Sequence, residues 1–380
     1  MRELVECWGQ LKLIASETRS TRRPPDKERR KEVEPSWKKS PLREGTTRLT
    51  AIDAHTAGGP LRLITSGLPE LSGTTILERQ RCLQEQFDWI RQAVLQEPRG
   101  HAEMCGCVLT PASSQEADFG VLFPTATGYS PMSGHSLIAV VTILLETGII
   151  PAQARRAVVN LETPVGVVQA TASLDPTGQV KRVSFRNVPS FVYARDVVVV
   201  VKGVGHITLD LAFGGNFCAV LPVSQFGLRV LPEHASTFVT LAEQIQQAVN
   251  VQMALQHPLE GPGTVYSIIF TDTPQNPAHH SRNVTIFGHG QVDRSPTGVG
   301  LSARLAVHDA RGELGEHEEL VIESILGAAS TLTGQIVGRT QVGSYPAVIP
   351  AISGQAFLTG YHELLIDPRD ALGQGFLLAG

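Results

Sequence analysis

Two stretches of the chain share one hydrophobic pattern, in which a short polar turn runs directly into an apolar helix. The first spans residues 129–148 (YSPMSGHSLIAVVTILLETG), with Ser133 at the junction between turn and helix. The second spans residues 293–310 (DRSPTGVGLSARLAVHDA), with Thr297 in the corresponding place. The first N–H groups of a helix can bind an anion, so two such helix starts facing each other would hold a small acid between them.

The remaining pattern predicts short strands and two further helices. Apolar residues recur at helical spacing over residues 74–95 and 231–254. Elsewhere, runs with strand-like patterning alternate with turns rich in Gly and Pro. Strands with one long helix in each half predict an α+β protein of two similar lobes. We expect the first lobe to span about residues 49–200 together with the C-terminal end, and the second about residues 201–345.

The N-terminal region, residues 1–48, differs from everything after it. Residues 18–44 are crowded with Arg, Lys, Glu and Pro and have no apolar period, which predicts a disordered charged tail. A targeting segment and a basic binding arm are the alternatives. The acidic residues Glu3, Glu6 and Glu17 argue against a transit peptide, because transit peptides are poor in acids.

Composition narrows the class of protein. A length of 380 residues favours two domains, and the 36 glycines suit an architecture with many tight turns. The formal charge of -4 argues against a nucleic-acid-binding protein. No run of residues approaches the roughly 18 apolar positions of a membrane span. Five cysteines are too few, and odd in number, for a disulfide framework, so we expect a reducing compartment, the cytoplasm.

The polar residues at the two helix starts each allow more than one interpretation. Ser133 and Thr297 are either helix N-caps or reacting hydroxyl groups, and a hydroxyl needs a neighbouring base or a strong local field to react. His135 could orient Ser133, bind a carboxylate or be a satisfied polar residue. Asp293 could accept a hydrogen bond from a substrate ammonium or ring N–H, or cap the turn.

Other motifs of known chemistry are missing from the sequence. Cys105 and Cys107 form a Cys-x-Cys pair, but no second pair completes a zinc site, which favours a packing role for both. The sequence contains no P-loop, no dinucleotide-binding fingerprint and no HExxH helix. We therefore expect no cofactor and no metal.

The motifs taken together resemble those of the proline racemase family, which includes proline racemase, 4-hydroxyproline epimerase and trans-3-hydroxy-L-proline dehydratase. The resemblance covers about residues 50–370. It implies two pseudo-symmetric lobes, each a sheet or barrel around a central helix, as in diaminopimelate epimerase-like folds. It also implies a site in the cleft between the lobes, a proline-like imino acid as substrate, no cofactor, and a homodimer. The segments that carry the resemblance are Asp53–Pro60 (DAHTAGGP), Glu97–His101 (EPRGH), Met132–His135 (MSGH), Phe213–Phe217 (FGGNF), Asp293–Gly298 (DRSPTG) and Thr359–Asp370 (TGYHELLIDPRD).

The resemblance also assigns roles to residues of this chain. Racemases and epimerases of the family work with a pair of thiols, or serine with cysteine, on opposite faces of the substrate Cα, and a thiol suits this because its pKa lies near 8.5. The dehydratase has threonine at the second position, where this chain has Thr297. Ser133 stands at the first position, where the dehydratase usually has cysteine. By the same resemblance, the substrate carboxylate would bind Gly134 and His135, Asp293 would hold the ring nitrogen, and backbone donors would come from Gly298 and Val299.

These assignments favour dehydration of trans-3-hydroxy-L-proline to Δ1-pyrroline-2-carboxylate, with Ser133 and Thr297 as catalytic residues. The carbanion left by proton removal would expel the 3-hydroxyl, because threonine does not readily reprotonate the opposite face. A 4-hydroxyproline epimerase or proline racemase is the first alternative, and the missing cysteine at position 297 counts against it. A relative that binds an imino acid with impaired catalysis is the second, since both thiols are replaced.

Overall fold

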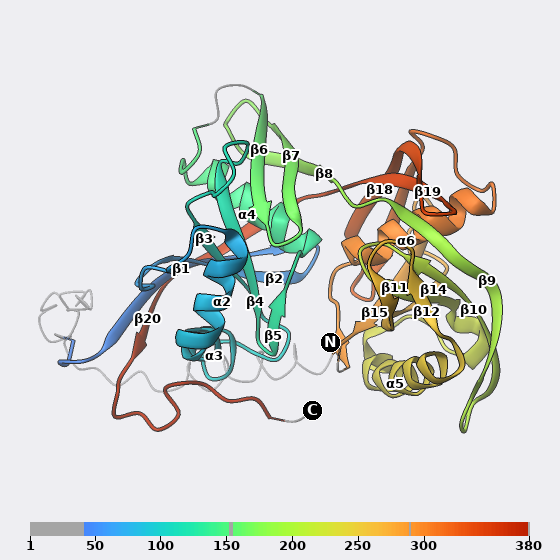
Figure 1. Ribbon diagram of the computed structural model, residues 1–380, viewed down its shortest axis with the longest axis horizontal. Helices are drawn as coiled ribbons and strands as arrows, with labels where there is room; N and C mark the ends of the chain where they lie inside the picture. The colour runs from blue at the N-terminus through green and yellow to red at the C-terminus, as the bar shows by residue number, and fades with distance from the viewer. Residues whose placement is uncertain (1–41, 152–154, 289, 379–380) are drawn as a thin grey trace, which may run out of the picture. The chain divides into compact units, whose positions relative to one another are not determined.

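The computed structural model describes residues 42–151, 155–288 and 290–378 (Figure 1). The charged tail predicted over residues 1–48 lies outside this part of the chain as far as position 41. From Glu44 onward the chain forms one compact unit, and its first strand begins at Thr47. None of the helices in the described ranges is both long and apolar enough to cross a membrane.

Strands dominate the described part of the chain, and most of them belong to one continuous hydrogen-bonded sheet. The helices are α2 (Ile76–Gln86), α3 (Asp88–Leu95), α4 (Gly134–Glu146), α5 (Ala235–Gln252) and α6 (Gly298–Ala310). The strands are β1 (Thr47–Thr56), β2 (Gly59–Ser66), β3 (Cys105–Thr110), β4 (Phe119–Thr125), β5 (Gly128–Ser130), β6 (Arg156–Thr163), β7 (Gly166–Leu174), β8 (Val180–Arg186), β9 (Ser190–Val201), β10 (Gly205–Phe213), β11 (Phe217–Pro222), β12 (Leu255–His257), β13 (Gly261–Gly263), β14 (Val265–Asp272), β15 (Ser281–Phe287), β16 (Gln291–Val292), β17 (Glu319–Ser324), β18 (Gly327–Val342), β19 (Tyr345–Gly354) and β20 (Ala356–Ile366).

The first lobe is built around α4, as the apolar run after Ser133 predicts. Strands β1, β2, β3, β7, β8 and β20 all contact this helix (Figure 1). Every residue from Ser136 to Leu145 is buried, because the helix is apolar on all sides and is enclosed by sheet. The turn before the helix is therefore held at a fixed place in the lobe.

The second lobe repeats this arrangement around α6. Strands β9, β10, β11, β18 and β19 contact α6, and α5 packs against β14 and β9. The buried Ser302 donates a hydrogen bond to the Gly298 carbonyl inside the helix. The fold is thus α+β with two pseudo-symmetric lobes, each a curved sheet around a central helix, which confirms the predicted fold class.

The lobes share strands as well as core. β19 pairs with β18 along its length, with β9 at Ala347 and with β8 from Ala351 onward. Phe191 and Val199 of β9 are buried in the hydrophobic cluster of the second lobe. We therefore propose that the chain passes between the lobes before β9, earlier than the boundary at residue 200 given by the sequence pattern.

One helix prediction is wrong in detail. The stretch 74–95 forms two helices, α2 and α3, because the backbone leaves the helical conformation at Phe87, with φ -131° and ψ 18°. Asp88 begins the next helix, and its carboxylate accepts a hydrogen bond of 2.7 Å from Arg91. The prediction over 231–254 is confirmed, since α5 occupies most of that range after a 3-10 turn at Pro232–His234.

A buried carboxylate anchors the strands that lead to the second helix start. Glu323 on β17 is fully buried and pairs with Arg282 of β15 at 3.0 Å and with His279 at 2.9 Å. Burial alone would raise the pKa of Glu323, but hydrogen bonds, first from the N–H groups of Asn276 and Gln275, hold it at about 2. The charged form of this carboxylate is therefore part of the folded structure.

Candidate active site

The two helix starts lie against each other. A Cβ atom added to Gly134 would lie 3.4 Å from the Cα of Gly298, and a Cβ on Gly298 would lie 3.4 Å from the Cα of Gly134. The ring of Phe185 packs beside both glycines, 3.1 Å from the first of these added atoms. The first turns of α4 and α6 thus bring their N–H groups and partial positive charges to one place, which suits a carboxylate ligand.

Ser133 occupies the N-cap position of α4, but its side chain does not cap the helix. Its hydroxyl instead donates a hydrogen bond of 2.8 Å to the Oγ of Ser136, which is fully buried. Ser136 Oγ in turn lies 3.3 Å from Nε2 of His135. Ser133 is partly exposed, and its hydroxyl is linked to the histidine through Ser136.

Thr297 holds the corresponding N-cap position of α6, and it does not cap its helix either. Its hydroxyl donates a hydrogen bond of 2.6 Å to Oδ2 of Asp293. Oδ1 of Asp293 accepts hydrogen bonds of 2.8 Å from both the N–H and the hydroxyl of Ser295. These three bonds leave a lone pair on Oδ2, since the two oxygens of a carboxylate accept about four hydrogen bonds.

His135 carries a positive charge at neutral pH. Its ring packs on Gly59, where an added Cβ would lie 3.0 Å from the imidazole, and its carbonyl accepts a 2.8 Å hydrogen bond from Thr56. Burial opposes the charge, but Cys105 and Asp293 outweigh it and raise the pKa of His135 to about 9. An imidazolium beside the helix starts strengthens the site for an anion and is not available as a base.

Cys105 lies beside the site and packs against the hydrophobic cluster around α4, in line with the packing role that the sequence favours. Cys105 is near enough to His135 to contribute to raising the pKa of its ring. The residue is partly exposed, whereas Cys107, two positions along β3, is fully buried. The alternation of the strand predicts that the two cysteines share a face, but only the folded chain shows that the first of them lies near His135.

The Phe213–Phe217 motif supports the second helix start from behind. A Cβ on Gly214 would clash with the carbonyl oxygen of Val299, so only glycine lets this turn approach α6 so closely. Asn187 donates to the Gly214 carbonyl at 3.0 Å and to Ser302 at 2.8 Å. The motif therefore helps to position the first turn of α6.

Contacts between the lobes lie next to these residues. Arg294, adjacent to Asp293, forms an ion pair of 2.8 Å with Glu103 of the first lobe. Gln291 donates a hydrogen bond of 3.2 Å to the carbonyl of Ala102. These contacts join the segment before Thr297 to the loop before Cys105, so they fix how closely the two halves of the site approach each other.

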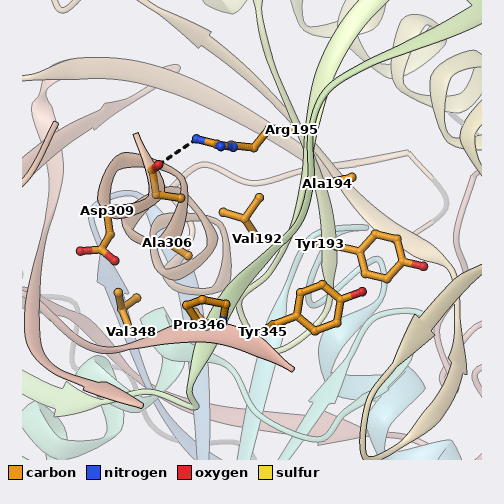
Figure 2. Close-up of a pocket in the computed structure, with 11 residues that line it drawn as sticks. Val192, Tyr193, Ala194, Arg195, Ala306, Asp309, Tyr345, Pro346 and Val348 are labelled. Carbon is orange, nitrogen blue, oxygen red and sulfur yellow. Dashed lines mark hydrogen bonds between the residues drawn. The ribbon is translucent and has the colours of Figure 1, made fainter. Parts of the chain in front are cut away.

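Two cavities lie outside the pair of helix starts. One, of about 430 Å³, is lined by α6 residues on the side facing β9 and β19, with Tyr193 and Tyr345 at one end and Asp309 at the other (Figure 2). Arg195 in this cavity donates to the Ala310 carbonyl. The other, of about 350 Å³, is lined by polar and apolar residues around Arg62. Neither cavity includes Ser133 or Thr297. The candidate active site is therefore the place where the starts of α4 and α6 meet.

The predicted site residues are therefore brought together at the two helix starts. The first lobe contributes Ser133, Gly134 and His135, and the second contributes Asp293, Thr297, Gly298 and Val299. Within the residues described by the structure, no cluster of three or more His, Cys, Asp or Glu side chains is placed to hold a metal ion. The arrangement can bind a small carboxylate and exchange a proton beside it.

Two lobes that present paired helix starts define the fold of the proline and hydroxyproline racemases and epimerases. The crystal structure of a hydroxyproline epimerase from Agrobacterium vitis, with bound trans-4-hydroxy-L-proline, matches with a TM-score of 0.77 and 33% identity, over 87% of this chain and 95% of that one. The family model described as proline racemase matches residues 51–377. The chain belongs to this family.

Curated relatives divide between two activities. A trans-3-hydroxy-L-proline dehydratase from Bacillus cereus is 43% identical over 87% of this chain and 98% of its own length. A proline racemase from Clostridioides difficile is 41% identical over 87% of this chain and 98% of its own length. The similarity establishes the family and leaves the reaction to be decided at the site.

Proposed function

We propose that this protein removes water from trans-3-hydroxy-L-proline and forms Δ1-pyrroline-2-carboxylate. The observation that carries the proposal is Thr297, whose hydroxyl donates to Asp293 at the position where racemases have a second thiol. A hydroxyl held in this way is a poor donor of a proton to the far face of Cα, so the carbanion loses its 3-hydroxyl instead. The named dehydratase at 43% identity supports the same reaction.

The free N–H groups at the starts of α4 and α6 bind the substrate carboxylate. The first backbone bonds of the helices run from Leu137 N to Ser133 O and from Leu301 N to Thr297 O, so the N–H groups before them are not used by the helices. The carboxylate receives N–H donors from Gly134 and from Gly298, and the charge of His135 adds to their field. The ring N–H of the substrate donates to the remaining lone pair of Asp293 Oδ2.

Stereochemistry makes one proton-transfer group sufficient. In trans-3-hydroxy-L-proline the carboxylate and the hydroxyl lie on opposite faces of the ring, so the α-hydrogen and the hydroxyl share a face. A group on that face can take the α-proton and return it to the departing hydroxyl as water. Ser133 is the residue that stands at this position by the family resemblance, opposite Thr297.

The test uses the purified full-length chain with trans-3-hydroxy-L-proline, trans-4-hydroxy-L-proline and L-proline in separate reactions. Formation of a cyclic imine that reacts with o-aminobenzaldehyde, from the 3-hydroxy substrate alone, is the expected result. Inversion at Cα of the other two substrates without imine would replace the proposal with the epimerase or racemase. Substrate binding without either reaction would indicate the impaired relative. The homodimer and the cytoplasmic location stay predictions.

A further inference from the structure

A cavity at the far end of α6 is separate from the candidate active site. It has a volume of about 430 Å³ and lies between the C-terminal turn of α6 and the strands β9 and β19 (Figure 2). Its α6 residues are Ala306, Asp309 and Ala310, whereas the active site uses the start of the helix at Gly298. Gly298 and Ala306 are about 12 Å apart along the helix axis, from the rise per residue of an α-helix. The cavity therefore offers a second place for a ligand.

One end of the cavity carries two opposite charges. Arg195, on β9, is exposed and donates one hydrogen bond of 2.8 Å from its guanidinium to the Ala310 carbonyl. Asp309, next to Ala310, accepts two hydrogen bonds from Arg339, and both go to Oδ1. Within the described ranges, no residue donates to Oδ2 of Asp309 or accepts from the other N–H groups of Arg195. Both a cation and an anion are thus available to a ligand at this end.

The other end of the cavity is aromatic. Tyr193 of β9 and Tyr345 of β19 stack with their ring centroids 5.7 Å apart and an interplanar angle of 21°. Tyr345 also packs on the buried ring of Phe191 at 5.0 Å, and the Tyr193 hydroxyl donates to the Ala254 carbonyl at 3.2 Å. Both half-buried rings are therefore held in place by the fold, and they provide a surface for an apolar or aromatic group.

Apolar side chains line the rest of the wall, among them Val192, Ala306 and Val348 (Figure 2). These side chains carry no polar atom, so a bound molecule has to place its charged groups near Arg195 and Asp309. Few polar groups at fixed places in a largely apolar wall are typical of sites for small molecules. A molecule with a zwitterionic head and an apolar tail matches this distribution.

We propose that this cavity binds a free α-amino acid with an aromatic or large apolar side chain. The carboxylate pairs with the guanidinium of Arg195, because charge-assisted hydrogen bonds of this kind are strong and directional. The ammonium donates to Oδ2 of Asp309, and the side chain lies against the rings of Tyr193 and Tyr345. The ligand differs from the imino acid at the helix starts, and the inference does not depend on the reaction proposed there.

Isothermal titration calorimetry of the full-length chain with L-phenylalanine tests the site. We expect a dissociation constant of about 1 mM or lower, which is ordinary for a ligand of this size. L-alanine, 3-phenylpropionate and 2-phenylethylamine lack the ring, the ammonium and the carboxylate, respectively. Each should bind at least about tenfold more weakly, because each leaves one end of the cavity without its partner. Equal binding of any of the three overturns the proposed ligand class.

Variants locate the bound amino acid. Arg195→Gln and Asp309→Asn should each weaken the binding of L-phenylalanine at least about tenfold. Lys202→Gln, after the end of β9, and Glu316→Gln, at the second ion pair of Arg339, remove the same charges outside the cavity. Both controls should bind L-phenylalanine within about twofold of the wild type. Thermal unfolding of each variant without ligand controls for folding, and the ligand should raise the unfolding midpoint of the wild type.

His135→Gln separates this cavity from the active site, and we expect it to bind L-phenylalanine like the wild type. Loss of binding in His135→Gln, with binding kept in Arg195→Gln, would place the amino acid at the helix starts and overturn the inference. Equal loss in the two charge controls overturns it as well. So does the absence of both heat and a shifted unfolding midpoint at about 10 mM L-phenylalanine. No turnover is measured, so these outcomes are independent of whether the protein forms an imine.

Discussion

Thr297 Oγ1 donates a 2.6 Å hydrogen bond to Asp293 Oδ2 while the backbone of Thr297 holds a φ of 68°. A positive φ is strained for a β-branched residue, at a cost of about 1–3 kcal/mol. The surrounding structure maintains it, because Thr297 N also donates to Ser295 Oγ at 3.1 Å. The strained backbone thus holds the Thr297 hydroxyl on the Asp293 carboxylate at the start of α6.

Thr297→Cys should add a proton donor on the far face of Cα. We expect inversion of trans-4-hydroxy-L-proline to rise at least tenfold above the wild type, because a thiol exchanges its proton near neutral pH. Chiral chromatography of the reaction mixture measures this. Thr297→Ser is the matched control, since it keeps the hydroxyl bond to Asp293. Equal inversion by the two variants would show that residue 297 does not choose between the reactions.

Carboxylate binding should weaken at high pH. The pKa of His135 is raised from 6.5 to about 9, so in the folded chain its charge is present at neutral pH and is lost as the pH rises through 9. We expect the dissociation constant of L-proline, measured by calorimetry, to rise about tenfold between pH 7 and pH 10. His135→Gln should bind more weakly at pH 7 and lose most of this dependence. A variant that keeps the full pH dependence would assign it to another group.

Glu323→Gln should destabilise the second lobe. The change leaves Arg282 buried without its charge partner, which costs about 3–5 kcal/mol in comparable cases. Urea unfolding at pH 7 measures the loss. Glu319→Gln is the control: Glu319 lies on β17 like Glu323, but its ion pair with Arg182 of β8 is exposed, so the free energy of unfolding should change by less than about 1 kcal/mol.

The same carboxylate predicts the acid response of the fold. Its pKa is about 2 in the folded chain against an ordinary 4.5, so the stability it provides is present above pH 4.5 and is lost as the pH falls toward 2. The wild type should therefore lose more stability than Glu323→Gln between pH 5 and pH 3. Parallel loss in both proteins would contradict the assignment.

Thr285→Val should stabilise the protein. The hydroxyl of Thr285, on β15, is the one buried side-chain oxygen or nitrogen without a hydrogen-bond partner in the part of the chain that the structure describes. Replacing it by a methyl group of similar size removes an uncompensated desolvation cost of about 1–3 kcal/mol. Thermal unfolding should show a higher midpoint for Thr285→Val and a lower one for Thr285→Ser, which keeps the hydroxyl. A lower midpoint for the valine variant would mean that the hydroxyl has a partner in solution.

Local sequence signals predicted the scaffold of the site well. The apolar runs after Ser133 and Thr297 form α4 and α6, because a helix that is apolar on all sides must be enclosed by other elements. The helix over 74–95 was less well predicted. Its periodicity continues through Phe87, and the break depends on a backbone conformation that the residue pattern does not reveal.

The sequence by itself determined the family, the two helix starts and the kinds of residue at each. Glycines, hydroxyl residues and apolar periodicity act within a few positions of the chain and so determined the helix starts, whereas the family followed from the resemblance of whole motifs. Only the tertiary structure decided which groups meet. Cys105 lies near His135 because parallel strands β2 and β3 bring distant segments to the start of α4. Ser133 and Thr297 each leave the capping role for a side-chain partner, a choice that depends on packing of the whole lobe and on no local spacing.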